Sequence, residues 1–333
     1  MTRVVDHPMS LRWQTLAWLL LGCSLTAQAN EALGWLERMS HAVRDLNYEG
    51  VFVYLHGDQL ESMRLLHGTA DGREMERLIS LNGPPREVVR DQHSVLRVLP
   101  EQRAISVGWR NADPSYHAIL SRSPEELTAN YEFALGERDR VAGRAVQVVV
   151  ITPRDQLRYG QRLFLDAEHA LPLKSELLDS DGRAVSQLMF TQLRVDPQMN
   201  LDWEVESEAE GAHYAWNYQP PAQSLDGDED ACDWRFDGLP AGFRITVHAR
   251  RNGTEPHPPQ EHFVLSDGLA TLSVYIEEAD PANPLAGGSR MGPMSVFGRV
   301  LAGHQITVVG EVPEETARWV ASTVRRQEQR GAP

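Results

Sequence analysis

Residues 161–178 read QRLFLDAEHALPLKSELL, and their pattern decides the fold. Two apolar-rich runs, Gln161–Asp166 and Leu173–Leu178, are separated by only six residues. Parallel neighbours need a crossover of about a dozen residues or more, so these runs must pair as antiparallel strands. The same pattern extends outward to Ala145–Ile151 on one side and to Val185–Val195 on the other. This part of the chain is therefore expected to form an antiparallel sheet.

Further apolar runs upstream enlarge the predicted sheet. They are Tyr48–His56, the two runs that flank Asp71-Gly72, Glu87–Val89 and Ser94–Leu99. The Asp-Gly pair is typical of a tight hairpin turn. Two helices accompany these strands: one begins at Asn30, a usable N-cap, and the other begins at Ser123 with Pro124 at its first position. We expect one large, curved antiparallel sheet with two or three helices packed against one face.

The C-terminal part of the chain repeats this composition on a smaller scale. Its predicted strands are Phe243–Ala249, Phe263–Leu265, Thr271–Ile276, Ser295–Leu301 and Gln305–Val309. A helix is expected from Pro313, because Glu314 and Glu315 fall in its first turn and apolar residues recur along one face. Arg325 and Arg326 are expected at the end of that helix. The pattern predicts a small sheet that covers one amphipathic helix.

Composition bounds both the fold and the function. The chain has 333 residues, of which 41% are hydrophobic and 24% charged, so it can bury a core and is not a disordered chain. Its formal net charge of −15 argues against a general nucleic-acid-binding protein, which needs a basic face. At about 100–200 residues per domain, this length predicts two domains.

The excess of acidic residues marks the predicted boundary between these domains. Residues 201–237 contain 11 acidic residues and one basic residue, a net charge of −10, together with two adjacent prolines. Like charges repel and proline extends a chain, so this segment has the properties of a solvated linker. The alternative is an acidic docking surface, because aromatic residues lie in or beside the segment: Trp203, Tyr214, Trp216 and Tyr218. The expected domains are 30–200 and 238–333, joined by 201–237.

The first 29 residues have the features of a secretory signal peptide. The ten-residue apolar run Leu16–Leu25 is too short to cross a bilayer, which takes about 20 residues. The small-residue pattern Ala27-Gln28-Ala29 follows, so cleavage is expected after Ala29. Translation from Met9 instead of Met1 would give a cleaner signal, and a weak lipobox that ends at Cys23 offers a lipidated N-terminus as the alternative. The mature chain is expected in an extracytoplasmic compartment.

Residues that could perform chemistry are sparse in the expected mature chain. Cys232 is the one cysteine after Ala29, which excludes an intramolecular disulfide. It is expected to be a core or linker residue, with an intermolecular disulfide or a reactive thiol as the alternative. The sequence has no nucleophile–base motif, phosphate-binding glycine loop or paired metal-ligand spacing. We therefore expect no enzymatic activity, no cofactor and no metal site.

A local excess of arginine runs against the acidic composition. Residues 138–162 have a net charge of +4 and flank the predicted hairpin of 146–151 and 161–166, so several guanidinium groups could lie on one rim of the sheet. These arginines are Arg138, Arg140, Arg144, Arg154, Arg158 and Arg162. Guanidinium groups bind phosphate through paired hydrogen bonds, so the cluster is a candidate site for an anionic lipid headgroup. A solvated charged hairpin is the alternative.

Short motifs in both domains resemble the MucB/RseB family. In the first domain they are RVAGR at 140–144, PRD at 153–155, RYG at 158–160 and LPLK at 171–174. In the second domain they are Trp234, LPAGF at 239–243, SDGL at 266–269 and ITVVGEVP at 306–313. Each motif is weak alone, but together and in order they span essentially the whole mature chain.

The resemblance implies a fold and a function. The first domain is expected to be similar to the half-open barrels of LolA and LolB. The implied fold class is therefore α+β, a large curved antiparallel half-barrel with packed helices followed by a smaller sheet-plus-helix domain. Family members are periplasmic regulators that bind the periplasmic region of an RseA- or MucA-type anti-sigma factor and shield it from the site-1 protease DegS. Lipopolysaccharide or a mislocalised lipidated protein is expected to release that partner.

Four residues of the second domain are candidates for partner binding, and self-association is left open. The candidates are Trp234, Phe243, Arg250 and Arg251. The alternative function is a periplasmic carrier of lipid or lipoprotein, which would need only the first domain. A periplasmic hydrolase is a third class, and it would need a nucleophile–base pair that the sequence lacks.

Overall fold

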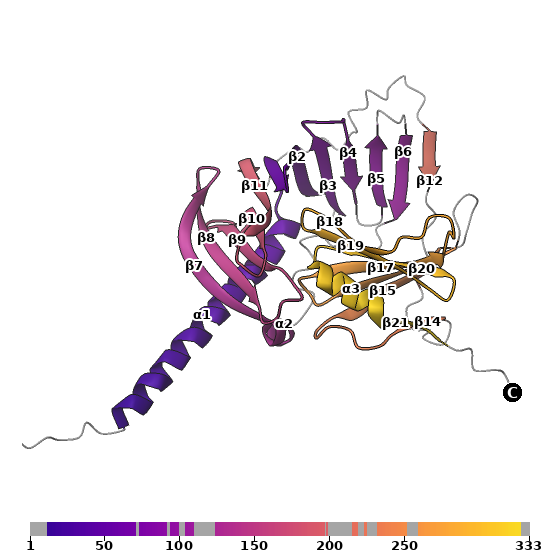
Figure 1. Ribbon diagram of the computed structural model, residues 1–333. Coiled ribbons are helices and arrows are strands. Elements are labelled where there is room, and N and C mark those ends of the chain that lie inside the picture. The colour runs from indigo at the N-terminus through magenta and orange to yellow at the C-terminus, as the bar shows by residue number, and fades with distance from the viewer. Residues whose placement is uncertain are drawn as a thin grey trace, which may run out of the picture.

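The computed structural model describes residues 12–70, 73–91, 94–99, 104–109, 124–196, 198, 215–218, 223–224, 232–251 and 259–327. The predicted turn at Asp71-Gly72, the predicted helix start at Ser123 and most of the acidic segment lie outside these residues. Two large sheets dominate the described part of the chain, one for each predicted domain (Figure 1).

The first sheet has 12 strands in the order β12-β6-β5-β4-β3-β2-β1-β11-β10-β9-β8-β7. The strands are β1 (Tyr48–His56), β2 (Gln59–Ala70), β3 (Arg73–Ser80), β4 (Glu87–Arg90), β5 (Ser94–Leu99), β6 (Ala104–Trp109), β7 (Tyr131–Val141), β8 (Arg144–Pro153), β9 (Gly160–Asp166), β10 (Pro172–Leu178), β11 (Ala184–Val195) and β12 (Ala215–Tyr218). The predicted antiparallel pairing of 161–166 with 173–178 is confirmed, because Ser175 of β10 lies opposite Leu163 of β9. On the other side of β10, Ser175 lies opposite Leu188 of β11. This register places alternate side chains of three strands on one face.

Helix α1 (Arg12–Asp45) packs on one face of this sheet. Residues 32–43 present an apolar stripe in which Leu36 and Met39 are completely buried. They join one core with side chains of β8 and β9 that include Val149 and Leu163. Strands β7 to β10 curve around the last turns of the helix (Figure 1). The short helix α2 (Pro124–Asn130) adds Leu127 to the same core.

Three details of the predicted first domain are wrong. The first helix does not begin at Asn30, because the preceding residues contain no proline from Arg12 onward and are apolar enough to continue the helix. Strands β6 and β7 were not predicted. β7 alternates buried and exposed side chains only at Tyr131–Ala134 and then enters a charged run, as an edge strand can. Finally, β12 pairs with β6 in parallel, because it returns from a distant part of the chain rather than through a hairpin.

The second sheet has seven strands in the order β13-β15-β16-β17-β20-β19-β18. Its strands are β13 (Gln223–Ser224), β15 (Arg244–Arg251), β16 (Gln260–Ser266), β17 (Thr271–Glu278), β18 (Gly287–Met291), β19 (Met294–Leu301) and β20 (His304–Gly310). Helix α3 (Glu314–Thr323) packs on this sheet through Ala317, Val320 and Ala321, which are completely buried. The predicted α+β class, a large antiparallel sheet followed by a smaller sheet with one helix, is confirmed.

The acidic segment contributes more to the fold than a linker would. Besides β12 in the first sheet, it supplies β13 to the second sheet and β14 (Trp234–Phe236), which pairs with β21 (Val324–Arg326). Arg325 and Arg326 therefore lie in a strand rather than at the end of a helix. Local charge cannot reveal these pairings, because each partner strand is distant in sequence.

Candidate functional site

The two domains meet at the guanidinium group of Arg158, which follows β8. Its side chain is completely buried, and its Nη1 atom lies 3.0 Å from the Oδ2 atom of Asp267 in the second domain, which is also completely buried. Its Nη2 atom donates a hydrogen bond of 2.6 Å to the carbonyl oxygen of Ala241. Asp155 of the first domain lies 3.3 Å from Arg158 Nε. A buried arginine thus connects both domains through charged and backbone partners.

Asp267 is held from both sides. Its Oδ1 atom accepts hydrogen bonds from the backbone amides of Leu269 and Ala270, which fixes the turn between β16 and β17. Its Oδ2 atom accepts a hydrogen bond of 2.8 Å from the Tyr131 hydroxyl at the start of β7. The turn of the second domain is therefore positioned by two side chains of the first.

Other contacts surround this pair. The Thr316 hydroxyl at the start of α3 donates to the carbonyl oxygen of Leu157 at 2.6 Å. Arg244 of β15 pairs with Glu126 of α2 at 2.9 Å. Gly242 has a φ of +81°, and a side chain there would collide with the Asn130 amide, so only glycine fits this approach of the two domains.

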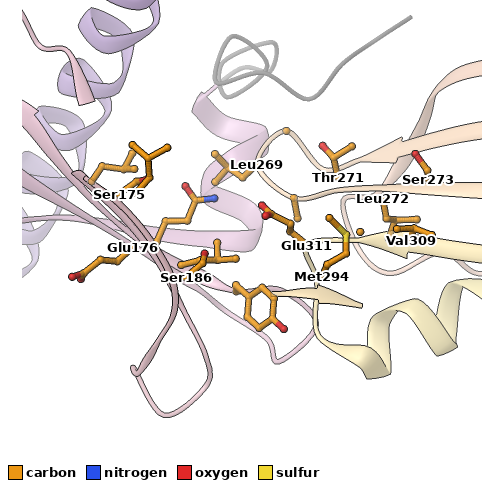
Figure 2. A pocket seen from close by; sticks show the side chains of 18 of the residues that line it. Ser175, Glu176, Ser186, Leu269, Thr271, Leu272, Ser273, Met294, Val309 and Glu311 are labelled. Atoms are coloured by element: carbon orange, nitrogen blue, oxygen red, sulfur yellow. The ribbon is translucent and has the colours of Figure 1, made fainter. Parts of the chain in front are cut away.

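A cleft of about 530 Å³ lies beside this junction, between the two sheets. One wall comes from the first sheet and includes Tyr54, Leu163, Ser175, Leu177, Ser186 and Leu188. The other wall comes from the second domain and includes residues 268–273, Met294, Val309 and Glu311. Figure 2 shows Ser175 and Ser186 on one side and Leu272, Met294, Val309 and Glu311 on the other, whereas the carboxylate of Glu176 points away from the second wall. Its volume falls within the range of ligand pockets, about 300–1,000 Å³.

The two carboxylates at this cleft have different environments. The Glu176 carboxylate has two cationic partners, because Arg162 and Lys174 lie 2.6 and 2.7 Å from its two oxygens. Glu311 lines the cleft and keeps part of its surface exposed to solvent. Loss of water around Glu311 raises its pKa, while a hydrogen bond from Tyr54 and the nearby His56 oppose that rise. Among the described residues that line the cleft, none is an arginine, lysine or histidine.

The structure does not bring the six predicted lipid-binding arginines to one rim. Arg138, Arg140 and Arg144 lie near the β7–β8 turn, whereas Arg154 and Arg158 lie at the other end of that hairpin. Arg158 is buried between the domains, and Arg162 pairs with Glu176. A charge count along the sequence could not separate these positions, because it does not show that the ten-residue strand β8 lies between them. Arg138, Arg140 and Arg154 remain exposed.

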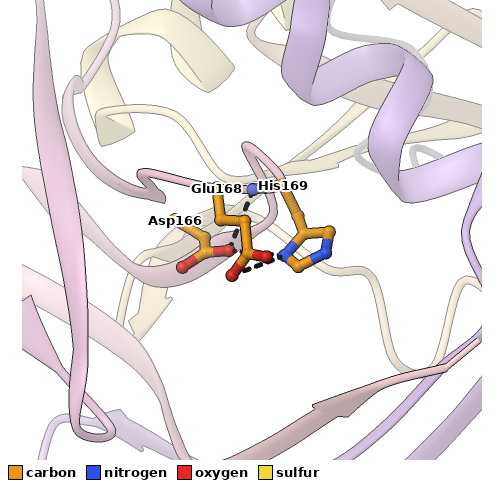
Figure 3. A group of neighbouring side chains, drawn as sticks. All are labelled: Asp166, Glu168 and His169. Carbon is orange, nitrogen blue, oxygen red and sulfur yellow. Dashed lines mark hydrogen bonds and ion pairs between the residues drawn. The ribbon is translucent and has the colours of Figure 1, made fainter.

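Arg144 has a structural role in a cluster that otherwise has metal-ligand character. Asp166, Glu168 and His169 place one ligand atom each within 4.8 Å of one another (Figure 3). The Arg144 guanidinium forms two hydrogen bonds of 2.9 Å with Asp166 and one of 3.1 Å with Glu168. Burial raises the pKa of Asp166, but hydrogen bonds from Arg144 and His169 outweigh it and lower that pKa overall. The cluster already contains its counter-charge in Arg144.

Two of the four predicted partner-binding residues lie in the interior. Trp234 and Phe243 are 5% and 7% exposed, and the Phe243 ring lies 5.1 Å from the Arg158 guanidinium carbon. Arg250 pairs with Glu261, whereas Arg251 is exposed at the end of β15. Of these four candidates, only Arg251 is exposed and could meet a partner without a change in the structure.

Cys232 is buried, as expected for a core residue, and it contacts His248 at 3.8 Å. His248 also lies 2.7 Å from Glu261 and stacks on Phe263. Burial lowers the pKa of His248, but its hydrogen bonds to Cys232 and Glu261 outweigh this and raise that pKa to about 9. Both partners contact the same nitrogen, Nε2, so this group lacks the relay arrangement of a nucleophile, a base and an orienting acid.

The residues that join the domains were not identified from the sequence as a site. Arg158 and Asp267 occur in the RYG and SDGL motifs, so the sequence marked both residues as part of family motifs. It did not indicate that the two side chains form an ion pair between the domains. Glu311 lies within the ITVVGEVP motif and carried no functional expectation of its own.

Comparison with known proteins assigns the family. Residues 31–209 match the family model of the MucB/RseB N-terminal domain, and residues 228–325 match that of the MucB/RseB C-terminal domain. The sigma factor AlgU regulatory protein MucB of Pseudomonas aeruginosa is 35% identical over 323 residues, which cover 94% of this chain and 98% of the relative. The sigma-E factor regulatory protein RseB of Escherichia coli K12 is 28% identical over 305 residues, 91% of this chain and 93% of the relative.

A solved structure agrees with these relatives. MucB in complex with MucA(peri) matches with a TM-score of 0.65 at 30% identity, over 89% of this chain and 99% of that one. Within the described residues, no helix is long and apolar enough to cross a membrane. The matches cover both domains in order and run almost the full length of the relatives. This chain therefore belongs to the MucB/RseB family of sigma-factor regulatory proteins.

Proposed function

We propose that this protein binds the periplasmic region of a MucA- or RseA-type anti-sigma factor and shields it from site-1 proteolysis. The observation that carries the proposal is the two-domain likeness to MucB, whose structure is known in complex with MucA(peri). Both domains are matched, and the buried Arg158–Asp267 pair joins them. The protein acts by binding rather than by catalysis, in line with the regulatory names of its relatives.

The proposed location is the periplasm. Residues 1–29 have the pattern of a signal peptide with cleavage after Ala29, and the partner bound by MucB is named as a periplasmic segment. Mass spectrometry of the protein purified from the envelope fraction tests this. An N-terminus at Asn30 supports it, whereas a lipidated Cys23 would show an anchored protein instead.

Binding and shielding are tested together with the purified mature chain and the periplasmic region of the anti-sigma factor encoded by the same organism. Calorimetry gives the dissociation constant. A cleavage assay with the site-1 protease then measures whether the chain slows proteolysis in proportion to the fraction of partner bound. A complex that forms without slowing cleavage would contradict the shielding role.

The releasing ligand in this proposal is lipopolysaccharide or another anionic lipid. Exposed guanidinium groups of Arg138 and Arg140 at the β7–β8 turn support binding of a phosphorylated headgroup. Lipopolysaccharide is added to the preformed complex, and release is compared between the wild type and the double variant Arg138→Gln/Arg140→Gln. Arg183→Gln provides a control, because Arg183 is an exposed arginine on a different turn.

The expected result is weaker release with the double variant and unchanged affinity for the anti-sigma segment. Equal release from both proteins would exclude this arginine pair as the headgroup site. Binding of lipopolysaccharide by a chain that does not bind the anti-sigma segment would favour the alternative, a lipid or lipoprotein carrier.

A further inference from the structure

The cleft between the domains has an electrostatic character that an anionic ligand would not favour. Its described lining contains no basic side chain, and Glu311 opens into it from the second domain. Glu176, the other carboxylate, is already paired with Arg162 and Lys174. A phosphate group in this cleft would therefore meet a carboxylate with no lysine or arginine in the described lining to compensate the repulsion.

Glu311 has polar neighbours within the described part of the chain but no strong cation among them. Among the described residues, no lysine or arginine forms an ion pair with Glu311, and its polar neighbours are the Tyr54 hydroxyl and His56. Figure 2 shows Glu311 among the side chains that line the cleft, on the wall of the second domain. A carboxylate held in a partly dehydrated cleft forms a strong hydrogen bond with a cationic donor that reaches it.

Both walls also contribute apolar side chains, beside tyrosines and small hydroxyl side chains. Leu163, Leu177 and Leu188 form one wall, and Leu272, Met294 and Val309 form the other. Apolar contact would supply affinity, whereas Glu311 would fix the orientation of the bound segment.

We propose that this cleft binds a segment of the anti-sigma factor in which a lysine or arginine is flanked by apolar side chains, with the basic group on Glu311. The inference rests on the proposed function and names the part of the partner that the cleft takes. Such a segment complements the cleft, which offers one carboxylate without a lysine or arginine partner among the described residues and apolar side chains on both walls. The cleft differs in charge from the exposed arginines at the β7–β8 turn. A cationic group suits the cleft, whereas an anionic ligand suits those arginines.

The position of one wall depends on the junction of the domains. Residues 268–272 follow Asp267 directly, and Asp267 is held by Arg158 and Tyr131. A segment bound in the cleft therefore contacts both domains, and the buried contacts of Asp267 set the position of the wall that the second domain supplies. A change in the relative orientation of the two domains would move one wall of the cleft and so favour release of the bound segment.

The test measures the dissociation constant of the periplasmic region of the anti-sigma factor for four proteins. They are the wild type, Glu311→Gln, Glu311→Lys and the control Glu315→Gln, which alters an exposed carboxylate on α3 outside the cleft. Thermal unfolding of each variant shows that it is folded. A charge-assisted hydrogen bond contributes about 1.5–3 kcal/mol, so Glu311→Gln should weaken binding by about 10- to 100-fold and Glu311→Lys by more. The control should bind as the wild type does.

A reciprocal change identifies the basic residue of the partner. Each lysine and arginine of the anti-sigma segment is replaced singly by glutamate, and one such variant should recover affinity for Glu311→Lys but not for the wild type. Unchanged binding by Glu311→Lys, or equal weakening by Glu315→Gln, would overturn the cleft site while leaving the proposed function intact. Absence of binding by the wild type would instead refute the proposed function.

Discussion

Arg158 and Asp267 belong to different domains, and their side chains meet at 3.0 Å with no exposure of either to solvent. An ion pair of this kind differs from the exposed pair of Arg154 with Glu132, in which both side chains are about half or more exposed. Removal of one partner from a buried pair leaves an uncompensated charge, whereas an exposed pair contributes little to stability. The junction between the domains therefore depends far more on Arg158 than on Arg154, which lies four residues earlier in the chain.

The first prediction concerns Arg158→Met. This change leaves Asp267 buried without its cation, so the free energy of unfolding should fall by about 3–5 kcal/mol. The domains should also lose cooperativity, and urea denaturation followed by tryptophan fluorescence and by circular dichroism should give separate transitions. Arg154→Met is the matched control and should change stability by less than about 1 kcal/mol. A single transition at wild-type stability in Arg158→Met would show that the buried pair does not join the domains.

The second prediction concerns the Tyr131 hydroxyl, which donates to Asp267 at 2.8 Å. Tyr131→Phe keeps the ring and removes a hydrogen bond to a charged group, which should lower the free energy of unfolding by about 1.5–3 kcal/mol. In the Arg158→Met background the same change should have a different effect, because both residues contact one carboxylate. Urea denaturation of the four proteins in this double-mutant cycle measures the coupling. Tyr275→Phe, a half-buried tyrosine of β17, is the control.

The third prediction concerns the alkaline side of the stability profile. Hydrogen bonds to Cys232 and Glu261 outweigh burial and raise the pKa of His248 to about 9 in the folded chain. A raised histidine pKa contributes stability below the unfolded value of about 6.5, and this contribution disappears as pH rises through about 9. The free energy of unfolding should therefore fall by about 1–3 kcal/mol between pH 6.5 and 9. The variant His248→Gln should lack this slope, and a wild-type slope in that variant would refute the assignment.

The fourth prediction concerns the acid side. Burial, aided by Arg251, lowers the pKa of His262 to about 4, so this imidazole is neutral in the folded chain at neutral pH. It stacks on Tyr275 and lies 3.0 Å from the Ser273 hydroxyl. A lowered histidine pKa gives stability above about pH 6.5 that is lost as pH falls toward 4. Thermal unfolding at pH 7, 5.5 and 4.5 should show a smaller loss in His262→Gln than in the wild type. Identical profiles would contradict this role.

Much of the first sheet follows from local patterns. The hairpins of β8 to β11 were predictable because apolar runs alternate with short turns, and a short turn allows only antiparallel pairing. The apolar face of α3 was predictable because Ala317, Val320 and Ala321 recur at helical spacing. Strand β7 was missed, since its charged half reads as a loop until β8 is known to pair with it.

The candidate site was less accessible to sequence reasoning. Arginines counted together along 138–162 separate in space, and Arg158 became a buried junction residue rather than part of an exposed patch. The acidic segment suggested a linker by its charge, yet three of its parts pair with strands elsewhere. Charge counts describe a segment in water, whereas the partner of each group depends on contacts between distant segments.

The amino-acid sequence by itself determined the strand and helix pattern, the α+β class and the family, because periodicity, turn chemistry and ordered motifs are properties of neighbouring residues. Only the tertiary structure decided that Arg158 meets Asp267, that Glu311 faces Leu177 and Leu188 across a cleft, and that β12 returns to β6. These relations join residues of separate segments, and their geometry exists only after both sheets have packed against each other.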